Sequence, residues 1–245
     1  MIPKIIHYCW FGNNEMPEKI KFCINSWKSH LKDYEFILWN EKNFNLDIAP
    51  FVRQAYDRKK YAFVSDYVRI YALKTHGGFY LDTDIEVKKT FNDMLDNKVI
   101  LGTDDQGYLT AFMASEPNHP FFQKLLYHYN KMQFLNDDGT MNTEVNNTWL
   151  QENLTSFGYK QKNTFQNLNE GIVIYPCEYF HAKSLTSGKL LTTKNTYCIH
   201  HHTLLWVSKK TKLIRFFRMK ILVPLLGAER YAKIVNWIRK KQNEQ

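Results

Sequence analysis

Cysteine is scarce in this sequence, and long apolar runs are absent. The four cysteines show no Cys-x-x-Cys spacing, which argues against a zinc knuckle or a redox pair and predicts reduced, buried thiols: Cys9, Cys23, Cys177 and Cys198. No segment reaches the ~18 consecutive apolar residues of a membrane span. Because residues 1–4 lack the charged and apolar regions of a signal peptide, we expect a cytoplasmic location. We then expect the sequons at Asn146 and Asn153 to be unused.

The composition is that of a folded domain. Apolar residues make up 44% of the 245 residues and aromatic residues 16%, which excludes a disordered chain. We expect one catalytic domain over residues 1–208 and a basic helical tail over residues 209–245. The net charge of +9 points to an anionic partner.

Two carboxylates close an apolar strand in the most informative stretch, residues 77–85. Alternation along a strand places Asp82 and Asp84 on one face, where two like charges repel unless a cation lies between them. With few protein ligands, such a site suits Mg²⁺ or Mn²⁺ bound to substrate phosphates. The alternative is a strand end whose acids point into water, because a short motif also arises by chance.

The segment before this strand predicts a helix over residues 62–75, ended by Gly77 and Gly78. Within its apolar sequence, Asp66 and Arg69 are three residues apart and share one face. Two interpretations are open, an exposed ion pair or a pair of charges facing a site. Since the other residues are mostly apolar, we expect the two charges to be buried or to face a cleft, and we place Arg69 in the cleft and not in a structural pair.

Strands and helices alternate along the chain. The pattern predicts strands at 4–10, 34–39, 79–82, 99–103 and 110–115, helices at 17–31, 50–59, 62–75 and 119–132, and a loop followed by a helix at 140–154. This order predicts an α/β domain with a mainly parallel sheet. Ligands then bind at the carboxyl ends of the strands, where residues 7–10 and 82–84 would emerge.

Three histidines, His200–His202, follow a short apolar segment. On a strand, His200 and His202 share a face and His201 takes the other, so they would not all serve one metal. A single imidazole as third ligand is compatible with Mn²⁺. The alternative is a solvated loop.

Several motifs together resemble the Asp-x-Asp sugar transferases, glycosyltransferase family 32, which are related to the catalytic domains of clostridial glucosylating toxins. The residues that carry the resemblance are Ile2–Trp10, Ser65-Asp66-x-x-Arg69, Gly77–Asp84 and, more weakly, Cys198–Trp206. The resemblance implies a glycosyltransferase-A-type nucleotide-sugar-binding sheet with flanking helices, here with a C-terminal helical extension. It also implies metal-dependent transfer, with retention, from a nucleotide sugar. The acceptor would be a surface polysaccharide (capsule or lipopolysaccharide) or a lipid-linked oligosaccharide.

The resemblance also implies roles for individual residues. Asp84 would ligate the metal, and Asp82 would contact the ribose and the metal shell. Arg69 would contact the donor sugar or phosphate, and Asp66 would contact the donor hydroxyls. These four residues form the catalytic set. Trp10 would stack on the nucleotide base, although burial in the core is the alternative. The remaining candidates are His7, Ser65 and Trp206 at the donor, and His200 and His201 at the metal. Leu205 stands where the family pattern has serine. A UDP-sugar is favoured over a GDP-sugar. Contacts with the acceptor are expected among Asp104, Asp105, Glu144 and Asn147.

The tail mixes basic and bulky apolar residues. Six basic residues lie between Lys209 and Leu222, and a second helical stretch, residues 228–241, ends in three more, with Pro224 expected to break the two helices. This pattern favours an anionic membrane surface as the partner. Nucleic acid is not expected, because there is no recognisable reader fold. The alternative is a hairpin that buries Phe216, Phe217 and Trp237 against the domain.

Two other functions remain open at this stage. One is an effector-like transferase that modifies a host protein, and the other is a non-catalytic basic protein that binds membrane or nucleic acid. Intact Asp66, Arg69, Asp82 and Asp84 argue against the non-catalytic protein.

Overall fold

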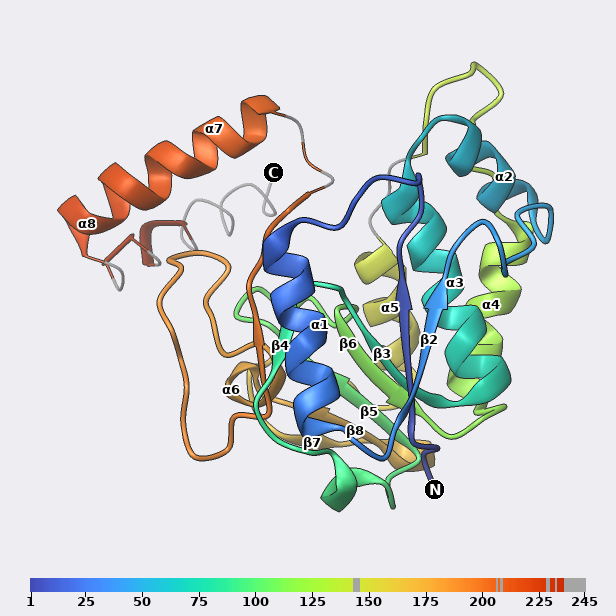
Figure 1. Ribbon diagram of the computed structural model, residues 1–245, viewed down its shortest axis with the longest axis horizontal. Coiled ribbons are helices and arrows are strands. Elements are labelled where there is room, and N and C mark those ends of the chain that lie inside the picture. Colours follow the sequence, from blue (N-terminus) through green and yellow to red (C-terminus); the bar gives the residue numbers. More distant parts are fainter. Residues whose placement is uncertain (143–145, 206, 208, 228–229, 232, 236–245) are drawn as a thin grey trace.

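A computed structural model describes residues 1–142, 146–205, 207, 209–227, 230–231 and 233–235. Its strands are β1 (Ile5–Cys9), β2 (Glu35–Trp39), β3 (Gly78–Leu81), β4 (Ile85–Val87), β5 (Val99–Gly102), β6 (Phe112–Ser115), β7 (Gln166–Asn167), β8 (Ile172–Tyr175) and β9 (Cys198–His200). Its α-helices are α1 (Glu18–His30), α2 (Pro50–Asp57), α3 (Tyr61–His76), α4 (Pro120–Lys131), α5 (Asn146–Thr155), α6 (Cys177–Phe180), α7 (Lys209–Phe217) and α8 (Val223–Leu226). The α/β class, the flanking helices and the helical extension are as predicted (Figure 1).

The central sheet is mixed, so the prediction of a mainly parallel sheet is wrong. Its order is β2-β1-β3-β6-β5-β8-β7, and three of its six neighbouring pairs are antiparallel. β5 and β6 form a hairpin because the connection 103–111 is shorter than the dozen or more residues that a parallel crossover needs. β1, β2, β3, β5 and β8 still run in one direction, so their carboxyl ends meet at one edge.

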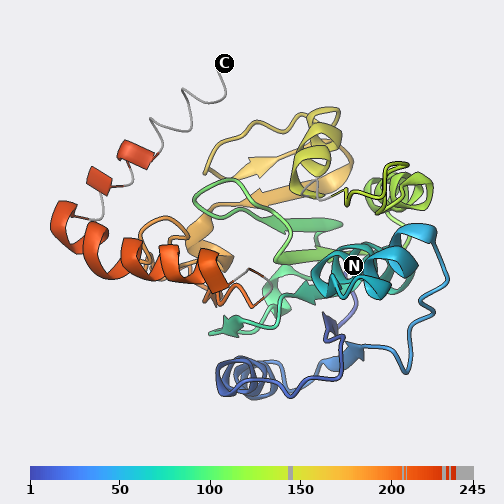
Figure 2. The same ribbon diagram turned by 90° about the horizontal axis from the view of Figure 1, so that it is seen from above.

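Each face of the sheet has its own apolar core. Alternate residues of β3 point to opposite sides: Tyr80 joins the core formed with α2–α5, and Phe79 and Leu81 join the core formed with α1. Helices therefore cover both faces, as Figure 2 shows from above. This packing fixes the sheet edge from which the site residues emerge.

The junction between α3 and β3 needs two glycines. Gly77 ends α3 with its N–H bonded to the Leu73 carbonyl, and both Gly77 and Gly78 have positive φ, +68° and +90°. A Cβ on Gly78 would lie 2.6 Å from the Ile5 carbonyl oxygen. The glycines thus let the chain turn sharply from α3 into the strand that precedes Asp82, as predicted.

The C-terminal extension remains helical through Pro224, which corrects the predicted break. A π-helical turn, Arg218–Leu222, joins α7 to α8, and the helix ends at Gly227. Pro224 lies just after this π-helical turn, where the α-helical hydrogen-bond pattern is already interrupted, so its missing N–H is tolerated there. The stretch 228–241 lies mostly outside the described residues. Within the part of the chain that the structure describes, no helix is long and apolar enough to cross a bilayer.

Candidate active site

The Asp-x-Asp motif lies in a turn. β3 ends at Leu81, and the Ile85 N–H bonds to the Asp82 carbonyl at 3.0 Å, so the chain reverses between β3 and β4. The prediction that strand alternation sets Asp82 and Asp84 on one face is therefore wrong. The turn brings the two carboxylates together instead.

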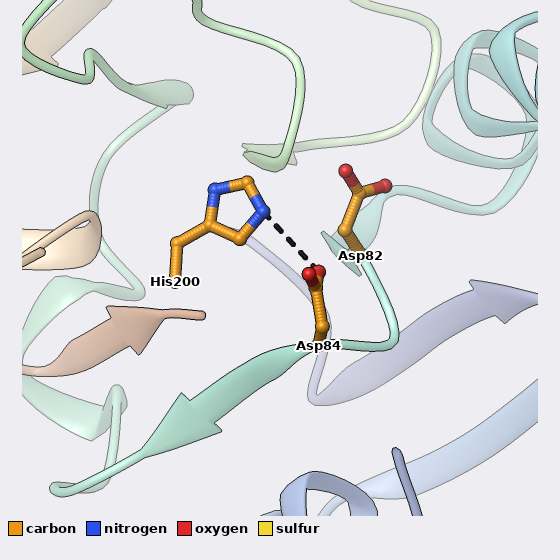
Figure 3. A group of neighbouring side chains, drawn as sticks. All are labelled: Asp82, Asp84 and His200. Carbon is orange, nitrogen blue, oxygen red and sulfur yellow. Dashed lines mark ion pairs between the residues drawn. The ribbon is translucent and has the colours of Figure 1, made fainter. Parts of the chain in front are cut away.

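A third ligand candidate comes from the far end of the chain. β4 pairs with β9 in a separate two-stranded sheet, whose register sets Ile85 opposite His200. Ligand atoms of Asp82, Asp84 and His200 all lie within 4.8 Å of one another. Figure 3 shows the Asp84 carboxylate near the imidazole of His200, with Asp82 beyond it.

Asp84 is the most firmly held member of this cluster. One carboxylate oxygen, Oδ2, accepts hydrogen bonds from the Thr203 N–H at 2.6 Å and the Thr203 hydroxyl at 2.9 Å. The other, Oδ1, lies 3.2 Å from His200 Nε2. Burial alone would raise the pKa of Asp84, but His200 and Thr203 together hold that pKa well below its usual range. The carboxylate is therefore ionised at neutral pH.

The pKa values of Asp82 and His200 are both raised, whereas that of Asp84 is lowered. Burial raises the pKa of Asp82, and the Asp84 charge raises it further, against the effects of Arg69 and His200. Burial lowers the pKa of His200, but the charges of Asp84, Asp82 and Asp104 outweigh it and raise the pKa overall. Three negative groups around one imidazole indicate a place where added positive charge is stabilised.

The three ligand groups fit a divalent cation. Adjacent ligands of an octahedral ion with bonds of about 2.1 Å lie about 3 Å apart, and the 3.2 Å between Asp84 Oδ1 and His200 Nε2 matches that edge. Two carboxylates and one imidazole are donors that Mn²⁺ accepts, and they leave half of a six-ligand shell for a substrate. Such an ion would also offset the repulsion between Asp82 and Asp84.

Arg69 is buried beneath this cluster. Its guanidinium lies 3.1 Å from Asp66 Oδ1 and 3.3 Å from Asp82 Oδ1, and it donates to the Thr110 carbonyl at 2.7 Å. Its Cζ sits 4.7 Å from the centre of the Tyr80 ring. With a side chain only 7% exposed, Arg69 ties α3 to the Asp-x-Asp turn. The expectation that Arg69 is not part of a structural pair is therefore wrong.

The other two histidines of the triplet point elsewhere. His201 Nε2 lies 2.8 Å from Glu86 Oε2, outside the three-residue cluster, so the structure does not place His201 among the metal-ligand candidates. His202 Nε2 bonds to the Lys183 carbonyl at 2.9 Å. The backbone pairing of β9 with β4 decides this selection, since it directs only His200 toward Asp84.

The donor-side candidates take different positions. His7 is fully buried: Nε2 contacts the Gly77 carbonyl at 2.9 Å, and Nδ1 accepts from the Trp39 indole, which is the placement of a core histidine. Burial lowers the pKa of His7 to about 4. Trp10 is partly exposed at the carboxyl end of β1, and its indole N–H donates to the Asn14 carbonyl at 2.6 Å.

Ser65 donates its hydroxyl to the Tyr61 carbonyl at 3.0 Å, one helical turn back. Trp206 lies outside the described residues. The proposed donor-side roles of both residues stay predictions.

Three of the acceptor-side candidates stabilise loops around the site. The carboxylate of Asp104, nearly buried after β5, accepts from the N–H groups of Gln106 and Tyr108, and burial raises its pKa to about 6. Asp105 accepts from the Ser184 hydroxyl and the Leu185 N–H, and the Asn147 side chain accepts from the Leu109 N–H. Glu144 lies outside the described residues. Acceptor contact by these residues stays a prediction.

Two residues of the site were not foreseen from the sequence. Thr203 binds Asp84 with both its N–H and its hydroxyl, and His181 contacts His200 from α6. His181 belongs to none of the motifs, and Thr203 lies within Cys198–Trp206 but is not one of the residues to which the resemblance gives a role. Only the packing of the 181–203 region against the Asp-x-Asp turn brings them there.

Comparison with known proteins agrees with this geometry. Residues 17–101 match the profile of a family described as "glycosyltransferase sugar-binding region containing DXD motif". Over these residues the chain is similar to this glycosyltransferase family. The match contains Asp66, Arg69 and both carboxylates of the Asp-x-Asp turn, and it stops before His200.

Named relatives are also glycosyltransferases. An uncharacterised glycosyltransferase of Acanthamoeba polyphaga mimivirus, L373, is 26% identical over the full length of both chains. Inositol phosphoceramide mannosyltransferase 2 of Schizosaccharomyces pombe is 32% identical over 54% of this chain and 39% of its own length. The chain thus spans about two fifths of that fungal relative. Among solved structures, a glycosyltransferase involved in glycosylation of the PBCV-1 major capsid is similar over 87% of this chain and 100% of its own, with 12% identity and a TM-score of 0.46.

Proposed function

We propose that this glycosyltransferase is metal-dependent and transfers a sugar from a nucleotide-sugar donor to a surface glycan or a lipid-linked glycan. The observation that carries the proposal is the cluster of Asp82, Asp84 and His200, whose ligand atoms lie within 4.8 Å of one another at the carboxyl end of β3. The resemblance of its motifs to family 32 favours retention at the anomeric carbon.

The chemistry explains why such a cluster is needed. In the transfer, the bond between the anomeric carbon and the diphosphate oxygen breaks, and a bond to the acceptor oxygen forms. A divalent cation held by the cluster would stabilise the negative charge that develops on the departing diphosphate. Asp82, Asp84 and His200 would hold that cation, which we propose is Mn²⁺ or Mg²⁺.

We propose a supporting role for Arg69. The two terminal nitrogens of its guanidinium already contact Asp66, Asp82 and the Thr110 carbonyl, and its Cζ lies over the Tyr80 ring. Arg69 therefore fixes the Asp66 and Asp82 carboxylates in the orientation that the donor meets. Direct contact of Asp66 with donor hydroxyls, and stacking of Trp10 on the base, complete the proposed donor site.

Thermal stabilisation by donors tests the proposal. Since a ligand that binds only the folded state raises its stability, a matching donor at ~100 times its Kd contributes about 2.7 kcal/mol, or about 5–10 °C in Tm for a chain of this size. The Tm is measured with UDP-sugars, which we favour, and with GDP-sugars, each in the presence of Mn²⁺ or of EDTA. Mannose donors are included because several relatives are named mannosyltransferases. Stabilisation that is equal in Mn²⁺ and EDTA contradicts metal dependence, and its absence with every donor contradicts the proposal as a whole.

We further propose that α7 to α8 lies on an anionic membrane surface, at the cytoplasmic leaflet where a lipid-linked acceptor would be presented. Its apolar side chains are exposed along most of its length, including Phe216 (56%) and Phe217 (50%), which disagrees with the alternative that buries both. Trp237 lies outside the described residues. From Lys209 to Ala228 the sequence has six basic residues and no acidic one. Apolar side chains next to basic ones match the boundary between acyl chains and anionic headgroups.

Few contacts of the described residues join this helix to the domain. Met219 packs directly over Gly188, where a Cβ would lie 2.2 Å from its Cε, and Val223 is buried. Arg218 reaches the Leu185 carbonyl at 3.5 Å. Because removal of the whole tail would also remove these contacts, substitutions on the exposed face give the cleaner test.

The double variant Phe216→Ser, Phe217→Ser is expected to bind vesicles containing phosphatidylserine about tenfold more weakly, because the two rings together contribute on the order of 1–2 kcal/mol of apolar burial. Its Tm and its donor hydrolysis should stay close to those of the intact protein. Co-sedimentation at low and high salt measures the binding, which salt should weaken.

Phe22→Ser is the matched control, since Phe22 is also 50% exposed but lies on α1. It should leave vesicle binding unchanged. The membrane proposal is wrong if the intact protein does not sediment with anionic vesicles at low salt, or if the double variant sediments as the intact protein does.

A further inference from the structure

We propose that His181 is a positioning residue for the metal site: it orients His200 and fixes which ring nitrogen of His200 faces Asp82 and Asp84. The inference rests on the proposed metal dependence. It assigns a function to a residue outside the family match and outside the Asp-x-Asp turn.

Contacts on both sides hold the His200 ring. His181 Nδ1 lies 3.3 Å from His200 Nδ1, with the two rings at 62° and their centres 5.3 Å apart. The His202 ring centre is 4.0 Å from that of His200. The opposite nitrogen of His200, Nε2, is thereby directed at Asp84 Oδ1. The ring is clamped in the orientation that a metal ligand needs.

His181 itself is rigidly placed. It follows α6, its N–H bonds to the Cys177 carbonyl at 2.8 Å, and it is only 1% exposed. The preceding residue, Phe180, stacks on Phe112 of β6 with ring centres 3.7 Å apart. The carboxyl end of β8 and the core beneath it therefore carry the imidazole that supports His200.

The contact between two nitrogens restricts where the protons lie. A neutral imidazole has one N–H, so one ring must donate across the 3.3 Å contact and the other must accept. For His200 Nε2 to offer its lone pair to a cation, the His200 proton has to be on Nδ1 and donated to His181 Nδ1. The other arrangement puts a proton on Nε2, where it faces Asp84 and blocks the cation. An acceptor at His181 thus selects the ligating form of His200.

The remaining nitrogen of His181 faces the backbone of Gly102. A Cβ on Gly102 would lie 3.1 Å from His181 Nε2, and the His181 ring forms a hydrogen bond with the Gly102 backbone. Because a backbone carbonyl only accepts, this contact favours a proton on Nε2 of His181 and leaves Nδ1 as an acceptor. His181 Nδ1 is then the acceptor that the ligating form of His200 needs.

The experiment compares the Kd for Mn²⁺ alone, measured by the EPR signal of free Mn²⁺, in the full chain and its variants. His181→Phe keeps a ring but no nitrogen, and should bind Mn²⁺ about 10–100-fold more weakly, the usual effect of losing the partner of a metal-binding histidine. His181→Asn places an acceptor near the position of Nδ1 and should retain most of the affinity. The Tm of His181→Phe is measured in EDTA, and a lower Tm with an unchanged affinity for Mn²⁺ would show a purely structural role for His181.

His119→Phe is the matched control. His119 is also buried, but its ring caps α4 through the Phe121 N–H, away from the cluster. This variant should lose stability and keep its affinity for Mn²⁺. If His181→Phe does not fold, His181→Met fills the space without a nitrogen and replaces it in the test.

Two outcomes overturn the inference, and they differ. If the intact protein binds Mn²⁺ and the Phe or Met variant binds it equally well, His181 does not position His200, while the proposed metal dependence stands. If the intact protein binds no Mn²⁺, the metal dependence is wrong and the inference is wrong with it.

Discussion

Asp84→Asn is expected to abolish both sugar transfer and donor hydrolysis, with a rate loss on the order of 10³-fold or more. The amide removes a negative ligand from the cluster, and loss of metal stabilisation of the leaving diphosphate costs several kcal/mol in the transition state. In the folded protein Asp84 is held by Thr203 and His200, so the variant keeps a partner for each of its two side-chain atoms.

The stability of the variant in EDTA should fall by only about 1–3 kcal/mol, because charge-assisted hydrogen bonds to Thr203 become neutral while the repulsion of Asp82 is relieved. Activity is measured as nucleotide release with and without acceptor, and folding by a denaturant titration. Asp96→Asn, at an exposed aspartate away from the cluster, is the control and should be fully active. Full activity of Asp84→Asn in EDTA would contradict the metal site.

Arg69→Ala is expected to lower the free energy of unfolding by about 3–5 kcal/mol, as well as to reduce turnover. The guanidinium is a buried cation shared by Asp66 and Asp82, and its removal leaves both carboxylates without it in a poorly solvated place. The Tyr80 ring also loses its cation, and the Thr110 carbonyl loses its donor. Denaturant unfolding in EDTA measures the loss.

Arg53→Ala provides a matched comparison. Arg53 also pairs with two aspartates, Asp47 and Asp57, but its side chain is 38% exposed against 7% for Arg69. Exposed ion pairs contribute about 0–1 kcal/mol, so this variant should unfold almost as the intact protein does. Equal effects of the two substitutions, or normal stability of Arg69→Ala with lost activity, would show that Arg69 has no structural role.

Much of the fold could be predicted because its determinants are local. Apolar spacing places the helices near residues 17–31, 62–75 and 119–132 and the first three strands, within one or two residues of their observed ends. Two adjacent glycines likewise define the end of α3, since only they tolerate the positive φ angles found there. The direction of β6 did not follow from its own residues, because it depends on the short connection from β5.

The sequence by itself determined the elements and the chemical groups of the site: two carboxylates after a buried strand, an Asp-Arg pair on one helical face and a histidine cluster. The tertiary structure decided how they combine. The turn after Leu81, and not strand alternation, brings the carboxylates together, and the burial of Arg69 joins it to both Asp66 and Asp82. The register of β4 with β9 selects His200 over His201, and α6 sets His181 behind it. The pairing of β4 with β9 links residues more than a hundred positions apart, and the packing of sheet and helices, which no local pattern encodes, fixes it.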